Sequence, residues 1–173
     1  MAYFLRFKLT WEAMYCTDSQ FVNCKKRFSL MEYFVGIDPG KTGAIAFLSE
    51  DGTAEVFDFP DAFSQLVKRA DRVRRAYLEQ VHAMPGQGVV STFSFGENYG
   101  WWQGVLMALR IPFLKVRPQD WQKNLVPKKG ASDKPSLEVA RQLFPDAPLG
   151  RKKDHNRADA LLIAYVCRKR ECL

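Results

Sequence analysis

The stretch "FVGIDPGKTGAIAFL", residues 34–48, decides how the chain is organised, because it joins two apolar runs through a Pro-Gly turn. Each run is typical of a buried strand, so together they predict a hairpin. The letters Gly40-Lys41-Thr42 also match the end of a phosphate-binding loop, G-x-x-x-x-G-K-[ST]. That loop needs a glycine where this chain has Val35, and a helix directly after the lysine. Asp38, rather than a nucleotide cradle, is therefore the chemical feature of the stretch.

The segments after the hairpin predict an α/β fold. "TAEVFDF" follows the Asp51-Gly52 turn as a third strand, which completes an antiparallel meander. Apolar residues at helical spacing predict a helix over residues 61–73, with Asp61 as its N-cap. We expect further strands at 76–81 and 112–116, and helices at 95–110, 118–125, 134–144 and 157–170. Strands reached through helices should run parallel to the first, giving a mixed five-stranded sheet flanked by helices.

Length and composition predict one domain. A chain of 173 residues suits a single core, and we assign that core to residues 31–173. Residues 1–30 are expected to be an amino-terminal appendage, either poorly ordered or an extension of the natural start at Met31. No run of about 18 apolar residues is present, so we expect no membrane span.

The charge pattern favours a nucleic-acid partner. The net charge is +7, and basic residues cluster at 25–27, 68–75, 128–129, 151–153 and 168–170. The four cysteines show no C-x-x-C spacing, and the chain has only two histidines, which argues against zinc. Unpaired cysteine spacing favours a reduced, intracellular compartment.

Four carboxylates are candidates for one metal site. Asp38 ends the first strand, Glu79 lies in the strand "AYLEQV", and Asp154 and Asp159 bracket the start of the last helix. Clustered acids repel one another unless their pKa values rise or cations bind. Oxygen ligands select magnesium or manganese over zinc. Two such ions, about 3.5–4 Å apart, activate water and stabilise the leaving oxygen in phosphodiester hydrolysis.

The segments "GIDPGKTGAIAF", "YLEQV" and "DHNRADALLIAYV" resemble the three acidic motifs of the RuvC-like Holliday junction resolvases, in their phage and organellar branch. "VRPQDWQKNL" and "LFPDAPLGRKKDHNRADALL" are also similar, so the resemblance extends over residues 33–169. It implies an RNase H-like fold, a homodimer, and symmetric, magnesium-dependent cutting of four-way DNA junctions. The resemblance implies two Mg²⁺ ions per active site, for which Mn²⁺ can substitute. It implies no nucleotide cofactor and no membrane partner. A cytoplasmic location is expected, which is the host cytoplasm for a phage protein.

The same resemblance implies roles for individual residues. Asp38 matches the acid that bridges both metals, Glu79 the second-strand acid, and Asp159 the helix acid. Bacterial members carry an acid or histidine where this chain has Asn156, whereas the organellar pattern points to Asp154 as the fourth ligand. His155 is a lesser candidate for the same metal or for the leaving group.

DNA contacts are predicted around these acids. The loop "HAMPGQGVVSTF" and the basic run "RKKDHNR" supply donors for phosphate oxygens. The predicted DNA-binding residues are Lys41, Gln87, Ser91, Thr92, Arg151, Lys152, Lys153 and Arg157. Trp101 and Trp102 lie on the apolar side of the 95–110 helix, which indicates core or a twofold dimer interface.

Two other functions stay open on the sequence. A less selective nuclease of the same fold would cut flaps and other branched DNA. A catalytically inactive protein would bind junctions without cutting them, although all the expected acids are present.

Overall fold

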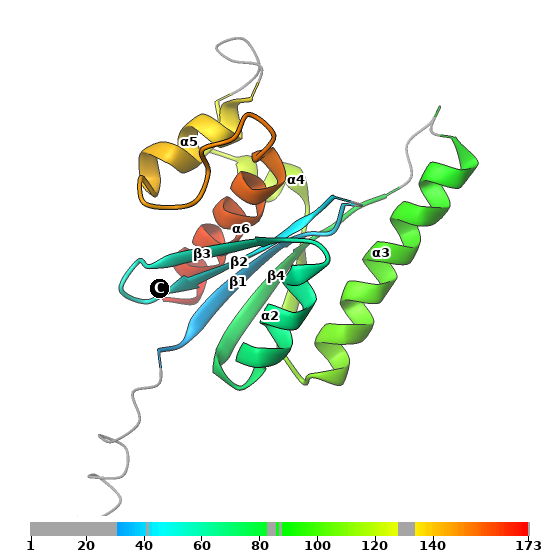
Figure 1. Cartoon of the computed structure of the whole chain (residues 1–173), viewed down its shortest axis with the longest axis horizontal. Helices are drawn as coiled ribbons and strands as arrows, with labels where there is room; N and C mark the ends of the chain where they lie inside the picture. The colour runs from blue at the N-terminus through cyan, green and yellow to red at the C-terminus, as the bar shows by residue number, and fades with distance from the viewer. Residues whose placement is uncertain (1–30, 41, 83–85, 87, 128–133, 173) are drawn as a thin grey trace, which may run out of the picture. The chain divides into compact units, whose positions relative to one another are not determined.

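Five strands form one mixed sheet in the computed structural model, in the order β3-β2-β1-β4-β5 (Figure 1). The structure describes residues 31–173 except 41, 83–85, 87, 128–133 and 173. The predicted appendage, residues 1–30, therefore lies outside the described residues. The strands are β1 (Tyr33–Asp38), β2 (Ala44–Ser49), β3 (Ala54–Asp58), β4 (Val73–Glu79) and β5 (Phe113–Val116). β1, β2 and β3 are antiparallel, while β4 pairs parallel to β1 and β5 parallel to β4, which confirms the predicted sheet.

Helices cover both faces of this sheet (Figure 1). On one face lie α4 (Pro118–Gln122), α5 (Pro135–Leu143) and α6 (His155–Glu171), and on the other α2 (Asp61–Arg69) and α3 (Val89–Ala108). Within the described part of the chain, none of these helices is both long and apolar enough to cross a membrane.

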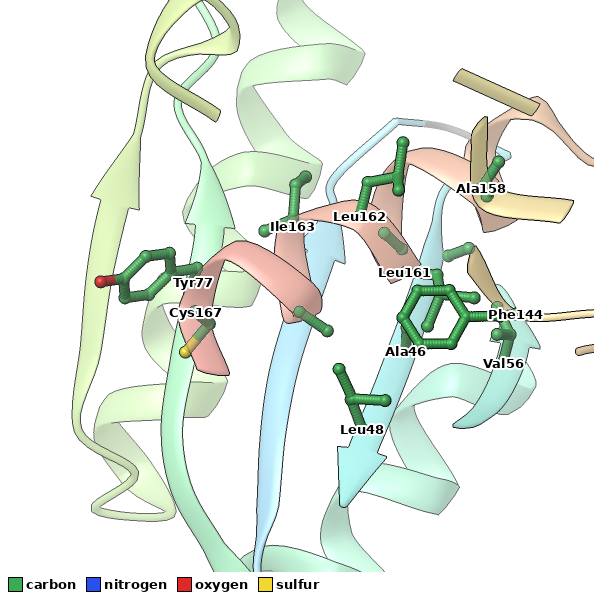
Figure 2. Close-up of a cluster of buried hydrophobic side chains, with 14 of the residues drawn as sticks. Ala46, Leu48, Val56, Tyr77, Phe144, Ala158, Leu161, Leu162, Ile163 and Cys167 are labelled. Atoms are coloured by element: carbon green, nitrogen blue, oxygen red, sulfur yellow. The ribbon is translucent and has the colours of Figure 1, made fainter. Parts of the chain in front are cut away.

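Alternate residues of the central strands divide between two apolar cores. Phe34 and Ala46 face α6, in the cluster that includes Leu161 and Leu162 (Figure 2). Their neighbours Val35 and Ile37 face α2 and α3 instead. Because β1 is covered on both sides, its six residues are all buried, as the continuous apolar run predicts.

Gly36 lets α6 approach β1 at backbone distance. A Cβ atom built on this residue would lie 2.0 Å from the Ala160 carbonyl oxygen and 2.3 Å from the Ala164 nitrogen. Only glycine can occupy such a position without moving the helix. The strand that ends in Asp38 is therefore pressed against the helix that carries Asp159.

Several helix boundaries differ from the prediction: α2 ends at Arg69 rather than at residue 73, α4 ends at Gln122, and α6 begins at His155. α3 begins at Val89, so Ser91 and Thr92 belong to a helix rather than to a loop. β-branched residues are weak helix formers, which is why the sequence favours a loop here. α2 begins at Asp61 with Pro60 at the N-cap position, so the prediction of Asp61 as the cap was wrong.

Candidate active site

Two carboxylates lie at the same edge of the sheet because their strands run parallel. Ile37 pairs with Leu78, so the next residues, Asp38 and Glu79, end their strands side by side. Asp159 reaches the same region from the second turn of α6. Asp38 is only 9% exposed, and the other two are partly buried. The structure thus brings together three of the predicted acids.

Burial raises the pKa values of all three acids, and neighbouring carboxylates add to the rise at Asp38 and Glu79. Burial raises the pKa of Asp38 to about 6, and the charge of Asp159 adds to the rise, while the Gly40 amide and His155 oppose it. Burial raises the pKa of Glu79 to about 7, with further rises from Asp38 and Asp159. Burial also raises the pKa of Asp159 to about 6. Such perturbed acids are typical of functional sites.

Three polar groups act on the acids. The Gly40 amide donates to Asp38 Oδ1 at 3.1 Å, and the Trp121 indole N–H donates to Glu79 Oε1 at 2.8 Å. Ser136, which lines the same cavity as Asp159, acts to lower the pKa of Asp159 against the effect of burial. Trp121 and Ser136 are functional candidates that the sequence did not reveal, because the acids beside them, Glu79 and Asp159, lie far away in the chain.

The donor chemistry of the cluster suits a hard divalent cation. Asp159 Oδ1 is buried and has no hydrogen-bond partner within the described part of the chain. An orphaned carboxylate oxygen beside two other acids is what magnesium or manganese would satisfy. Among the residues that the structure describes, however, no three His, Cys, Asp or Glu side chains already converge closely enough to hold an ion. The carboxylate oxygens are the type of ligand that such a cation prefers, but the side chains would have to move closer together to bind it.

His155 belongs to this site more directly than Asp154 does. It is the first residue of α6, and its charge lowers the pKa of Asp38. A cavity of about 260 Å³ lies beside it. The cavity is lined by Lys134, Pro135, Ser136, Leu137, His155 and Asp159. Lys134, which sequence reasoning did not select, brings a second basic group to this cavity, and its Nζ donates to the Lys152 carbonyl at 2.5 Å.

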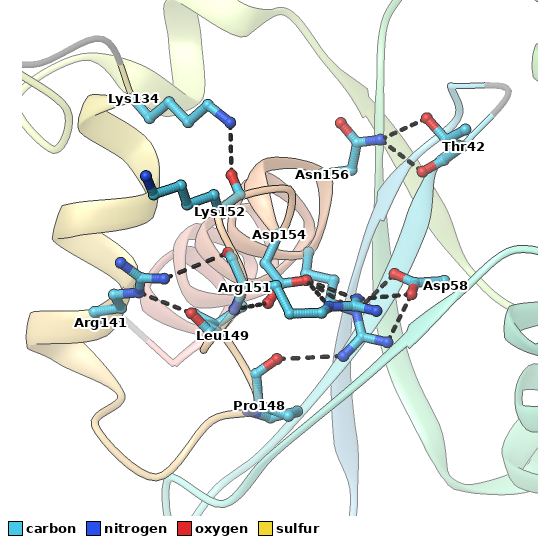
Figure 3. A network of polar contacts seen from close by, with 11 residues as sticks. Thr42, Asp58, Lys134, Arg141, Pro148, Leu149, Arg151, Lys152, Asp154 and Asn156 are labelled. Carbon is cyan, nitrogen blue, oxygen red and sulfur yellow. Dashed lines mark hydrogen bonds and ion pairs between the residues drawn. The ribbon is translucent and has the colours of Figure 1, made fainter.

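Asp154 lies instead in a network of arginine contacts (Figure 3). It is 1% exposed, and Arg151 donates to it from the backbone amide at 2.7 Å and from Nε at 2.7 Å. Burial acts to raise the pKa of Asp154, but these contacts with Arg151 hold it below its usual range. Its carboxylate is therefore occupied within the protein, and the structure does not bring it into the three-acid cluster.

The other end of this network is Asp58, the last residue of β3. Arg157 donates to both Asp58 oxygens, at 2.6 and 2.7 Å, and Arg151 Nη2 lies 3.0 Å from Asp58 Oδ2 (Figure 3). We call Asp58, Arg151, Asp154 and Arg157 the arginine clasp. The clasp joins the end of β3 to the first turns of α6, and it engages two arginines that the sequence predicted to bind DNA.

The remaining predicted DNA-binding residues lie in varied surroundings. Lys152, Lys153 and Ser91 are exposed. The Thr92 hydroxyl, in the first turn of α3, donates to the carbonyl of Gly88, the residue before the helix, at 3.1 Å. Lys41 and Gln87 lie outside the described residues.

Asn156 occupies the position where the bacterial pattern has an acid or histidine. Its Nδ2 donates to the Thr42 carbonyl at 2.6 Å and to Thr42 Oγ1 at 3.0 Å. This pair ties the turn after Asp38 to the first turn of α6.

The fold is similar to that of bacterial RuvC. The structure of Thermus thermophilus RuvC in complex with a Holliday junction substrate matches 81% of this chain and 96% of its own, with a TM-score of 0.52 and 15% identity. The yeast mitochondrial Holliday junction resolvase Ydc2 matches with a TM-score of 0.46 and 16% identity, over 79% of this chain and 78% of its own. The first match shows a RuvC-like, RNase H-like fold, as the acidic motifs predict.

One curated relative matches part of the sequence. The chloroplastic Holliday junction resolvase MOC1 of Chlamydomonas reinhardtii is 33% identical over 90 residues, or 51% of this chain. The chain spans about a tenth of the length of this relative, because the match covers 10% of it. No family model matches the chain. The similarity to RuvC-like resolvases, including an organellar one, is thus confirmed.

Proposed function

We propose that the chain is a structure-selective endodeoxyribonuclease that uses magnesium to resolve four-way DNA junctions by paired nicks. The observation that carries the proposal is the meeting of Asp38, Glu79 and Asp159 at one edge of a RuvC-like sheet. The similar bacterial protein is solved with a Holliday junction substrate, and the similar algal protein is a Holliday junction resolvase. Both support the same substrate class for this chain.

The three acids would hold the cations. His155 is our preferred fourth ligand over Asp154, whose carboxylate is taken up by Arg151. Two magnesium ions held there would supply the chemistry for phosphodiester hydrolysis, which is activation of a water and stabilisation of the leaving oxygen. Manganese would substitute because it accepts the same oxygen ligands. The protein's own task would be to orient the carboxylates, through the donors of Gly40 and Trp121.

Basic residues beside the acids would carry the DNA backbone. Lys134 and His155 line the cavity next to Asp159, and Lys152 and Lys153 are exposed nearby in sequence. Phosphate contacts of this kind supply affinity without sequence information. Arg151 and Arg157 already pair with Asp58, which would compete with phosphate for them.

A homodimer formed through α3 is the proposed assembly. This helix exposes Val89, Val90, Phe93 and Met107 by 85, 80, 67 and 68% respectively. Its glycines at 96, 100 and 104 recur every fourth residue, and a Cβ atom on each would meet nothing within 4 Å. An open apolar helix face of this kind suits close packing against a second copy. A twofold dimer would match the twofold symmetry of a junction and cut opposing strands.

Cleavage of a synthetic four-way junction tests the proposal. We expect paired nicks with Mg²⁺ and none with EDTA, mapped to the nucleotide on each strand. Asp38→Asn should abolish cutting while junction binding persists, because the substitution removes a ligand charge but keeps the fold. A fully active Asp38→Asn protein would refute the proposal. Equal rates on a flap indicate the less selective nuclease, and binding without Mg²⁺-dependent cutting indicates an inactive binding protein.

A further inference from the structure

The contact between Trp121 and Glu79 joins two elements that are distant in sequence. Trp121 lies on the short helix α4, which follows β5, and Glu79 ends β4. The indole N–H donates to Glu79 Oε1 at 2.8 Å, across a sequence separation of 42 residues. Trp121 is itself 1% exposed, so the donor approaches the carboxylate from within the apolar core.

The position of Trp121 is fixed from several directions. Val116, the residue opposite Glu79 in the β4–β5 pairing, accepts a bond from the Gln80 amide at 2.7 Å and so fixes the end of β5. Arg117, the residue before α4, pairs with Asp120 of that helix at 2.8 Å. Arg170, from the last turn of α6, donates to the Asp120 carbonyl at 3.0 Å. The helix that holds the indole is thus attached to both β5 and α6.

Trp102 shows what a buried tryptophan does without this contact. It is 2% exposed and belongs to the opposite core, between the sheet and α3. Its ring packs against Trp101, with centroids 5.0 Å apart. The two tryptophans therefore have similar burial, and only Trp121 meets a carboxylate of the acid cluster.

We infer that Trp121 is a positioning residue that holds the Glu79 carboxylate in the orientation in which it binds a divalent cation. The inference rests on the proposed function, because Glu79 acts there as a metal ligand. A single short hydrogen bond to one carboxylate oxygen restricts rotation of the group about its terminal torsion. The cation then meets a ligand that is already oriented, and less ordering entropy is lost on binding.

Hydrogen bonds that protein groups donate to metal ligands affect metal affinity by a known amount. Their removal typically lowers metal affinity or activity by about 10- to 100-fold. Phenylalanine keeps most of the aromatic volume of tryptophan and lacks the N–H donor. We therefore expect Trp121→Phe to weaken Mn²⁺ binding by about tenfold, at the lower end of that range.

Calorimetric titration of the full chain with Mn²⁺, without DNA, tests the inference. Trp121→Phe should bind Mn²⁺ about tenfold more weakly than wild type, while Trp102→Phe changes the affinity by less than about twofold. Junction binding without metal should be unchanged in both variants. Raising Mn²⁺ about tenfold should restore junction cleavage by Trp121→Phe, which a general structural defect would not allow. A folded Trp121→Phe protein with wild-type Mn²⁺ affinity would overturn the inference.

Two further measurements keep the outcomes separate. If wild type itself binds no Mn²⁺, or Asp38→Asn binds it unchanged, the proposed function fails before the inference is reached. If Trp121→Phe does not fold, NMR of the indole N–H groups of ¹⁵N-labelled wild type takes its place. The Trp121 signal is assigned with Phe variants of the other three tryptophans. Mg²⁺ should then shift the Trp121 signal most, and an unshifted Trp121 signal in a protein that binds Mg²⁺ refutes the inference.

Discussion

Replacing Asp38 by asparagine should stabilise the metal-free protein at neutral and alkaline pH. The pKa of Asp38 is about 6 in the folded protein, against an ordinary value of 3.8. Below pH 3.8 the carboxyl group is protonated in both the folded and unfolded states, and it contributes no penalty. Between pH 3.8 and about 6 only the folded state keeps the proton, so the free energy of unfolding falls as pH rises. Above about pH 6 the penalty is complete.

The size of this penalty follows from the rise in pKa. A rise from 3.8 to about 6 corresponds to about 3 kcal/mol of lost stability. Asparagine carries no charge at any pH in this range, and its Oδ1 can still accept the Gly40 amide proton. The variant should therefore gain up to about 3 kcal/mol at about pH 8 and almost nothing at about pH 4.

Urea unfolding in EDTA, followed by circular dichroism at these two pH values, measures the effect. Asp146→Asn is the matched control, because it makes the same chemical change on an exposed carboxylate. Mg²⁺ should stabilise wild type more than Asp38→Asn, since a cation that binds only the folded state adds to its stability. A variant no more stable than wild type at about pH 8, or with the same gain at both pH values, would refute the reasoning.

The remaining predictions concern Glu79, the clasp and α3. Glu79→Gln should also stabilise the metal-free protein by about 3 kcal/mol, with a gain that grows as pH rises and is complete near pH 7. Urea unfolding from acid to alkaline pH would locate this range, and a gain already complete below pH 6 would contradict the prediction. Arg157→Ala should cost about 2 kcal/mol in urea unfolding, because it removes two charge-assisted bonds to a half-exposed Asp58, whereas Lys153→Ala should cost less than about 0.5 kcal/mol; equal losses would exclude a role for the clasp. Phe93→Glu should keep the circular dichroism spectrum of the folded protein and yield monomers in light scattering, and a persistent dimer would place the interface elsewhere.

The positions of Asp38 and Glu79 could be predicted from the sequence because strand geometry settles them. Asp38 ends its strand as predicted, whereas the predicted strand 76–81 extends past Glu79, which is the last residue of β4; strands linked by a helix run parallel, so the two acids meet at one edge. Asp159 could be predicted from its motif in the last helix. These residues depend on local pattern and on one rule of topology.

The partners of Asp154 and Glu79 could not be predicted in the same way. Asp154 precedes α6 and His155 begins it, so the two face different surroundings although they are neighbours. Which of them faces the acids depends on Arg157 and Asp58, whose contact spans 99 residues. The contact between Trp121 and Glu79 could not be predicted either. A tryptophan in an apolar pattern indicates a core position, but the pattern does not indicate which group accepts the indole N–H.

Gly36 has a consequence for how variants of this protein would be interpreted. It carries no side chain and contributes no group to the chemistry, yet β1 can lie against α6 only because a methyl group is missing there. In a survey of random substitutions scored by lost activity, Gly36 would rank beside Asp38. Cellular abundance would separate the two, since the first loss removes the folded protein and the second leaves it intact. A position can therefore be as intolerant of change as a catalytic residue while its only contribution is empty space.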